Sequence, residues 1–142
     1  MIPGNAAAIR PMRFRPGQHL RRQSDIRAVR EHGSRVDCQS FTVWWRLRPV
    51  ALDAAPAEQP GSPRACVVAS TQAVGPAVQR NRAKRRLREI FRQQQGLLPA
   101  GCDVLLVARG AVNRRPFPEL RQTFAAACGR ISSRASGSKT HD

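Results

Sequence analysis

The chain has 142 residues, and its 25 lysines and arginines outnumber 9 acidic residues, which gives a formal net charge of +16 and a pI near 11.8. A chain of this length supports one domain with a real core, and this charge favours nucleic acid first and an anionic membrane second as the partner. No apolar run approaches the roughly 20 residues that span a bilayer, and the N-terminus has no apolar segment of signal-peptide length. We therefore expect a cytoplasmic protein that does not bind membranes.

Two terminal segments differ in composition from the rest of the chain. Residues 1–17 place Arg10, Arg13 and Arg15 among Pro and Gly, which is typical of a flexible basic arm. Residues 132–142 are rich in Ser and Gly and predict a flexible tail that cannot bury a core. One domain is therefore expected over residues 18–131.

The first predicted elements are a short helix and a strand. Ser24 can cap the helix, Ile26 and Val29 face inward, and Gly33 ends it. The segment 40–48 then alternates strictly, which predicts a half-buried strand of an antiparallel sheet. Its apolar face carries Phe41, Val43, Trp45 and Leu47, and its polar face carries Ser40, Thr42, Trp44, Arg46 and Arg48.

Trp44 is unusual because it stands on the polar face of this strand, two residues from Thr42 and from Arg46. An exposed aromatic ring among cations can stack an unpaired base, worth roughly 1 to 3 kcal/mol. A helix that covers Trp44 would instead make it a core residue. The pattern alone leaves both interpretations open.

A loose connection over residues 49–63 leads to a second strand over 64–70, and Gly75 and Pro76 then begin a helix that is expected to reach about Gln95. The segment 80–92, RNRAKRRLREIFR, makes this helix strongly cationic. Like charges four residues apart repel by a few tenths of a kcal/mol each, and a polyanion would relieve that repulsion, whereas a merely solvated face normally mixes signs. The side that faces the core carries Ala83, Leu87, Ile90 and Phe91, and the opposite side carries Lys84, Arg85, Arg88 and Arg92.

Residues 102–109 are apolar on both sides and predict a buried strand, so the order strand, helix, strand predicts a parallel crossover. Pro116 and Pro118 open the last helix. Its inward positions are Leu120, Phe124, Cys128 and Ile131. The order helix, strands, helix, strand, helix predicts an α+β fold, a small α/β sandwich with helices packed on one sheet.

The sequence shows no catalytic constellation. His19, His32 and His141 lie in the expected arm region, at a helix end and in the tail, and the acidic residues are dispersed. We therefore expect no catalytic residue, no metal site and no cofactor on the protein. Zinc sites need clustered ligand pairs, so reduced and mostly buried thiols are expected for the four scattered cysteines, Cys38, Cys66, Cys102 and Cys128.

The segment from Gly75 to Glu89, GPAVQRNRAKRRLRE, closely resembles the Arg-Asn-Arg signature of bacterial ribonuclease P protein subunits. The resemblance covers about residues 18 to 131. It implies a ribosomal protein S5 domain 2-like fold, in which an unusual left-handed crossover carries the signature helix. It also implies that an RNA subunit performs the hydrolysis with its own Mg²⁺, and that the protein binds this RNA and the single-stranded 5′ leader of precursor tRNA.

The same resemblance implies the site residues. The leader is held in a cleft between the sheet and the first helix, where Trp44 is the strand aromatic and Ile26 and Arg30 stand where the family commonly has aromatics. Arg46 lies on the same strand. The RNA-contacting residues of the signature helix are Arg80, Asn81, Arg82, Lys84, Arg85 and Arg88, and Arg92 extends the same cationic face.

The function expected from the resemblance is endonucleolytic removal of 5′ leaders from precursor tRNA, with no obligate protein partner. Two alternatives fit the charge and the predicted fold in part. One is a non-catalytic ribosomal or ribosome-associated RNA-binding protein. The other is a stand-alone nuclease, which the absence of an acidic cluster in the sequence disfavours.

Overall fold

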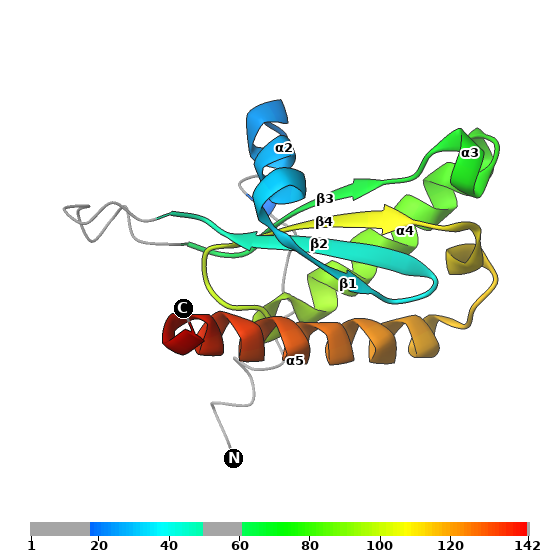
Figure 1. Ribbon diagram of the computed structural model, residues 1–142. Coiled ribbons are helices and arrows are strands. Elements are labelled where there is room, and N and C mark those ends of the chain that lie inside the picture. The colour runs from blue at the N-terminus through cyan, green and yellow to red at the C-terminus, as the bar shows by residue number, and fades with distance from the viewer. Residues whose placement is uncertain (1–17, 50–60, 142) are drawn as a thin grey trace, which may run out of the picture.

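The computed structural model describes residues 18–49 and 61–141 (Figure 1). The helices are α2 (Gln23–His32), α3 (Thr71–Val74), α4 (Ala77–Gln94) and α5 (Phe117–His141), and the strands are β1 (Ser34–Asp37), β2 (Phe41–Leu47), β3 (Arg64–Val68) and β4 (Cys102–Ala108). Two 3-10 turns, η3 (Gln95–Leu97) and η4 (Gly110–Asn113), follow α4 and β4.

The four strands form one sheet in the order β1-β2-β4-β3. Strands β1 and β2 form an antiparallel pair, β2 and β4 form another, and β3 runs parallel to β4. The predicted strands and the parallel crossover are confirmed, whereas β1 was not predicted. Its four residues, SRVD, bury only Val36, so the segment shows too little alternation to be recognised from the sequence.

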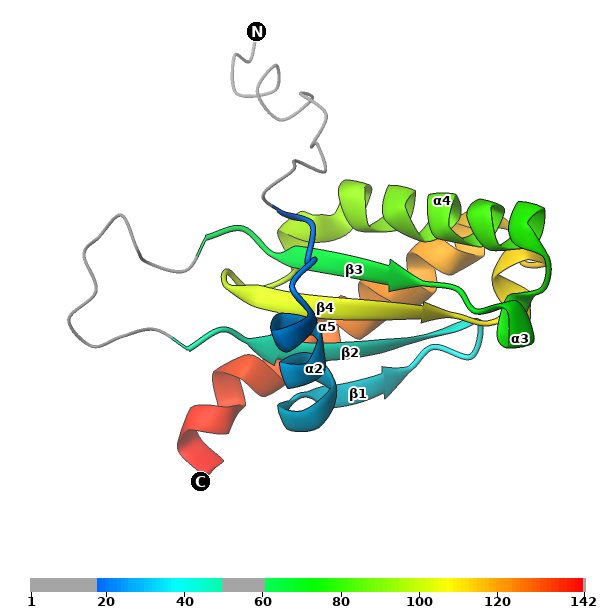
Figure 2. The same ribbon diagram turned by 90° about the horizontal axis from the view of Figure 1, so that it is seen from above.

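The crossover that carries α4 is left-handed. Figure 2 views the sheet from the side of α2, with the arrows of β3 and β4 pointing the same way and β3 above β4 in the picture, and Figure 1 shows that α4, which connects them, lies on the opposite face of the sheet from α2. Strand-crossover-strand connections are right-handed in about 98% of cases. The arrangement therefore agrees with the unusual handedness that the resemblance implied.

The two faces of the sheet are packed unequally. One face rests on α4 and α5, and the main core there includes the fully buried rings of Phe41, Phe91 and Phe124 (Figure 1). The other face carries a smaller cluster of Leu20, Val29 and Leu105 beneath α2. Among the described residues a single short helix therefore covers this face, and that is the face on which Trp44 stands.

A buried carboxylate helps to hold α2 in position. Asp103 of β4 is 2% exposed and accepts hydrogen bonds from Arg48 at 2.5 Å and from Arg64 Nε at 2.8 Å. Arg64 also lies 3.6 Å from Asp25 of α2. Because the charges are paired, the network links α2 to the sheet without leaving Asp103 uncompensated.

Gly33 ends α2, as predicted, but its role is steric. Its φ is −92°, which other residues adopt readily. A Cβ atom added there would overlap the carbonyl oxygens of Val29 and Trp45. The glycine therefore allows the end of α2 to approach β2 closely.

Several details differ from the sequence-based expectations. Arg22, and not Ser24, is the N-cap of α2, and it makes no side-chain cap bond; the buried Leu20 and the ion pair of Asp25 fix this end of the helix instead. Pro76 is the N-cap of α4 and not its first helical residue. Helix α5 continues to His141 through the segment that was expected to form a tail, and the basic arm at 1–17 and residues 50–60 of the connection lie outside the described residues.

Candidate nucleic-acid interface

Helix α4 is anchored by the predicted apolar stripe. Ala83, Leu87, Ile90 and Phe91 are all 0% exposed and belong to the main core. Burying a Leu, Ile or Phe side chain contributes about 1.5 to 3 kcal/mol. The helix is therefore held firmly while its other side faces solvent.

Arg86 turns back toward the protein and is a structural residue of the cationic segment. Its Nε donates to the carbonyl oxygen of Val112 at 3.1 Å, and its Nη2 donates to that of Arg115. The guanidinium carbon also lies 5.8 Å from the centre of the Phe117 ring. These contacts join α4 to η4 and to the start of α5.

The other predicted RNA-binding residues differ in how far they are engaged. Arg80 Nε donates to the carbonyl oxygen of Gly75 at 3.1 Å. Arg92 Nε donates to Glu89 at 2.9 Å, and this hydrogen bond lowers the pKa of Glu89. Within the described part of the chain, no hydrogen bond or ion pair engages the side chains of Asn81, Arg82, Lys84, Arg85 and Arg88.

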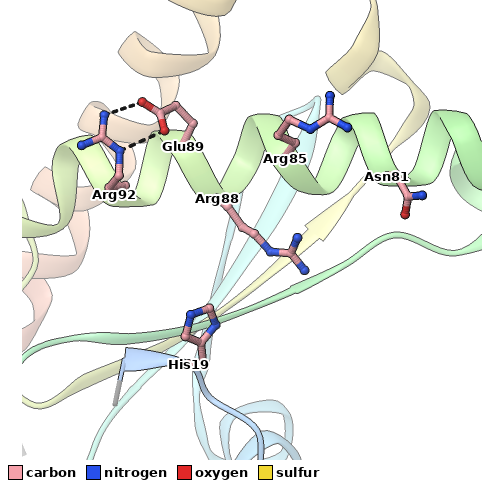
Figure 3. Close-up of a pocket in the computed structure, with 6 residues that line it drawn as sticks. All are labelled: His19, Asn81, Arg85, Arg88, Glu89 and Arg92. Atoms are coloured by element: carbon pink, nitrogen blue, oxygen red, sulfur yellow. Dashed lines mark hydrogen bonds and ion pairs between the residues drawn. The ribbon is translucent and has the colours of Figure 1, made fainter. Parts of the chain in front are cut away.

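A pocket of about 530 Å³ runs along this side of α4. Figure 3 shows the side chain of Arg88 extending from the helix toward His19 of the N-terminal segment. The lining residues are His19, Asn81, Arg85, Arg88, Glu89 and Arg92. His19 was not predicted as a binding residue, because a bridge between separate parts of the chain, His19 with Ala65 of β3, brings it here.

Trp44 is half-buried and has cations over its ring. The guanidinium carbon of Arg30 lies 5.0 Å from the ring centre and that of Arg35 lies 6.0 Å away. Trp44 and Ile26 both pack against the small cluster beneath α2. The structure thus brings Ile26, Arg30 and Trp44 together, and it answers the open question about Trp44: α2 covers the indole only in part.

Arg46 does not belong to the group around Trp44. It stands on the same face of β2, but it lines a separate pocket of about 310 Å³ with His32, Gly33 and Leu47. Its cross-strand partner on β4 is Asp103. Arg35, by contrast, was not predicted, because the strand that places it opposite Trp44 was not recognised.

The open part of the same sheet face continues toward α4. Val68 is 37% exposed, and Cys66 is half-buried. Burial raises the pKa of the Cys66 thiol, and the positive charges of Lys84 and Arg88 oppose that rise. The charges of Lys84 and Arg88 on α4 thus act on a residue of this sheet face.

Within the described residues, no group of three or more His, Cys, Asp or Glu side chains is placed to hold a metal ion. All four cysteines are free thiols, and Cys38, Cys102 and Cys128 are buried, as expected. Over residues 18–49 and 61–141, none of the helices combines the length and the apolar character of a membrane span.

Comparisons with known proteins agree with the signature. A family model described as Ribonuclease P matches residues 14–132. A ribonuclease P protein component from Acidothermus cellulolyticus is 34% identical over 122 residues, which cover 86% of this chain and 91% of that protein. One from Symbiobacterium thermophilum is 45% identical over 65 residues, so this match spans 46% of the chain and only 56% of the relative.

Solved structures show the same fold. The RNase P protein from Thermotoga maritima superimposes with a TM-score of 0.64 at 26% identity, over 80% of this chain and 96% of that one. The Staphylococcus aureus RNase P protein gives a TM-score of 0.61 at 19% identity, over 81% and 94% of the two chains, which supports the fold alone. With a family model that matches residues 14–132 and a relative matched over nearly its whole length, the chain belongs to the ribonuclease P protein family.

Proposed function

We propose that the chain is the protein subunit of a bacterial-type ribonuclease P, which binds the catalytic RNA and the 5′ leader of precursor tRNA and so assists removal of the leader. The observation that carries the proposal is the contrast between the two sides of α4. One side of the helix is fully buried, while Arg82, Lys84, Arg85 and Arg88 have no partner within the described residues. This arrangement presents a fixed row of cations to a polyanion.

The physical basis is charge neutralisation. Lys84 and Arg88 are like charges four residues apart, and they repel in the free protein. Phosphate groups would relieve the repulsion, and their condensed counterions would be released to solvent. Binding of this kind positions a protein on RNA without reading its sequence.

The proposed leader site is the surface around Trp44. Arg30 already lies over the indole at 5.0 Å, so an incoming base would share the ring with a guanidinium or displace it. Arg30 and Arg35 can also neutralise leader phosphates while Trp44 and Ile26 supply an apolar surface. Leader affinity here would therefore combine stacking with phosphate contacts.

We assign the hydrolytic chemistry to the RNA subunit. Its Mg²⁺ would activate the attacking water and stabilise the leaving oxygen, and this chain would contribute binding alone. A cytoplasmic location with its RNA is part of the proposal. The four free cysteines are in keeping with a reducing compartment.

A reconstitution tests the proposal. Precursor tRNA is incubated with the protein alone, with the catalytic RNA alone at low Mg²⁺, and with both together. We expect efficient leader removal only in the combined sample. Cleavage by the protein alone would instead indicate a stand-alone nuclease, and no gain from added protein would favour a ribosomal RNA-binding role.

A further inference from the structure

We propose that His19, Arg85 and Arg88 form a clamp for an RNA phosphate between the N-terminal segment and α4, and that protonation of His19 strengthens it. The inference rests on the proposed function, because it assumes that α4 faces RNA. It adds a residue outside the signature and makes RNA affinity depend on pH.

The position of His19 is fixed on both sides. Gln18, 5% exposed, donates from Nε2 to the side chain of Gln95 and to the carbonyl oxygen of Pro63 at 3.2 Å. Leu20 is buried, and its backbone N–H donates to the carbonyl oxygen of Ala65 at 2.8 Å. The segment is therefore attached along the edge of β3, and His19 is held beside α4 without help from a ligand.

The α4 side of the pocket is a single row of polar residues. Asn81, Arg85, Arg88 and Arg92 are spaced by four, three and four residues, which places them along one line of the helix. At 1.5 Å per residue, Arg85 and Arg88 begin only about 4.5 Å apart along the axis. Figure 3 shows Arg88 pointing toward His19 from that row, whereas the guanidinium group of Arg85 is directed away from it, so Arg85 reaches the same phosphate group only after a change of side-chain rotamer.

The charge balance of the pocket favours an anion. Arg85 and Arg88 make no hydrogen bond or ion pair with the described residues, whereas Glu89 is occupied by Arg92 and by Gln93, whose Nε2 donates to it at 2.8 Å. A pocket of about 530 Å³ has ample room for a phosphate group. The cations in it are thus partly uncompensated in the free protein.

The protonation state of His19 should respond to that anion. The charged groups that face it from α4 are Arg85, Arg88, Arg92 and Glu89. On the β3 side, Arg64 precedes the bridge partner Ala65, but it is engaged by Asp103 and Asp25. A phosphate group bound beside His19 would favour the imidazolium form over the neutral imidazole.

Histidine ordinarily changes charge between about pH 5 and 8. RNA binding should therefore take up a proton at His19, and by linkage RNA affinity should rise as the pH falls. Neutral imidazole can still donate one hydrogen bond to phosphate, so the site weakens at high pH and does not vanish.

The test measures the dissociation constant of the full-length protein for the catalytic RNA at about pH 6 and about pH 8. We expect the wild type to bind roughly three- to tenfold more tightly at the lower pH than a His19→Gln variant does. His32→Gln is the matched control, because His32 lines the separate pocket at the end of α2, and it should behave as wild type. His19→Lys should restore tight binding at both pH values, which a merely structural role of His19 would not allow.

A second arm identifies the source of the phosphate. The holoenzyme is assembled with each variant, and its affinity for precursor tRNA is compared with that for mature tRNA. If His19→Gln weakens binding of the catalytic RNA, the phosphate belongs to the RNA subunit. If it weakens only the binding of precursor tRNA by the holoenzyme, the phosphate belongs to the leader. Identical pH dependence of His19→Gln and wild type in both arms overturns the clamp.

An Arg85→Ala variant separates this inference from the proposed function. If Arg85→Ala weakens RNA binding while His19→Gln changes nothing, only the clamp is wrong. If Arg85→Ala also binds RNA as tightly as the wild type, the assignment of α4 as the RNA-binding helix is wrong.

Discussion

Two neighbouring arginines of α4 should have different effects when they are replaced. Loss of Arg85 should weaken RNA binding, whereas loss of Arg86 should lower the stability of the fold. Arg85 is exposed and has no hydrogen bond or ion pair with the described residues, whereas Arg86 donates to the carbonyl oxygens of Val112 and Arg115. The substitutions Arg85→Ala and Arg86→Ala remove the same side chain one position apart. They therefore form a matched pair in which only the direction of the side chain differs.

The structure gives a magnitude for each variant. Loss of one phosphate contact at Arg85 should reduce the slope of log K against log salt by about 0.7 to 0.9. Stability should change by less than about 0.5 kcal/mol, because the side chain has no partner to lose. Arg86→Ala should cost roughly 1.5 to 3 kcal/mol of unfolding free energy, because the charged group loses one part-buried hydrogen bond and a second, exposed one that contributes little, and the salt slope should not change.

Filter binding of the catalytic RNA over a series of salt concentrations measures the slopes, and thermal unfolding measures stability. For a domain of this size, 1 kcal/mol corresponds to a shift in Tm of about 4 °C. If both variants lose the same increment of salt slope, the division of α4 into an RNA side and a protein side is incorrect. An unchanged Tm for Arg86→Ala would contradict the structural role of Arg86.

The remaining predictions concern the leader surface and the attachment of α2. Trp44→Ala should weaken binding of precursor tRNA by about 1 to 3 kcal/mol and leave mature tRNA unaffected; equal losses on both substrates would remove Trp44 from the leader site. Asp103→Asn should destabilise the fold by roughly 3 kcal/mol in urea unfolding, because Arg48 and Arg64 lose their buried partner, and a change below about 0.5 kcal/mol would argue against the network. Gly33→Ala should cost roughly 1 to 3 kcal/mol through overlap with two carbonyl oxygens; an unchanged midpoint would show that the end of α2 moves away freely.

Much of the fold could be predicted from the sequence because its signals are local. The alternation over residues 40–48 and the stripe Ala83, Leu87, Ile90 and Phe91 each report one face of one element, and the structure buries those faces apart from Leu47, which is 38% exposed at the end of its strand. The strand β1 was missed because only Val36 of its four residues is buried. It pairs with β2 across a tight turn at residues 38–40, where Gln39 has a φ of 67° and no Gly or Pro signals the turn in the sequence.

The site was predictable in part for the same reason. The cationic side of α4 follows from helical spacing, but spacing could not show that Arg80 and Arg92 are partly engaged while Arg85 and Arg88 are not. Arg35 reaches the surface around Trp44 through the hairpin of β1 and β2, whose first strand shows too little alternation to be recognised. His19 reaches the α4 pocket through a bridge to Ala65, which is distant in sequence, so no local signal could have placed it there.

The central claim is that the unpaired cations of α4 bind the RNA subunit of ribonuclease P. Affinity purification of the full-length protein from its host, followed by sequencing of the bound RNA, tests it most directly. A matched variant replaces Arg82, Lys84, Arg85 and Arg88 with alanine and keeps Arg86. We predict that the wild type enriches the catalytic RNA and that the variant loses it while retaining its fold. Enrichment of ribosomal RNA in place of the catalytic RNA, or full retention of the catalytic RNA by the variant, would contradict the claim.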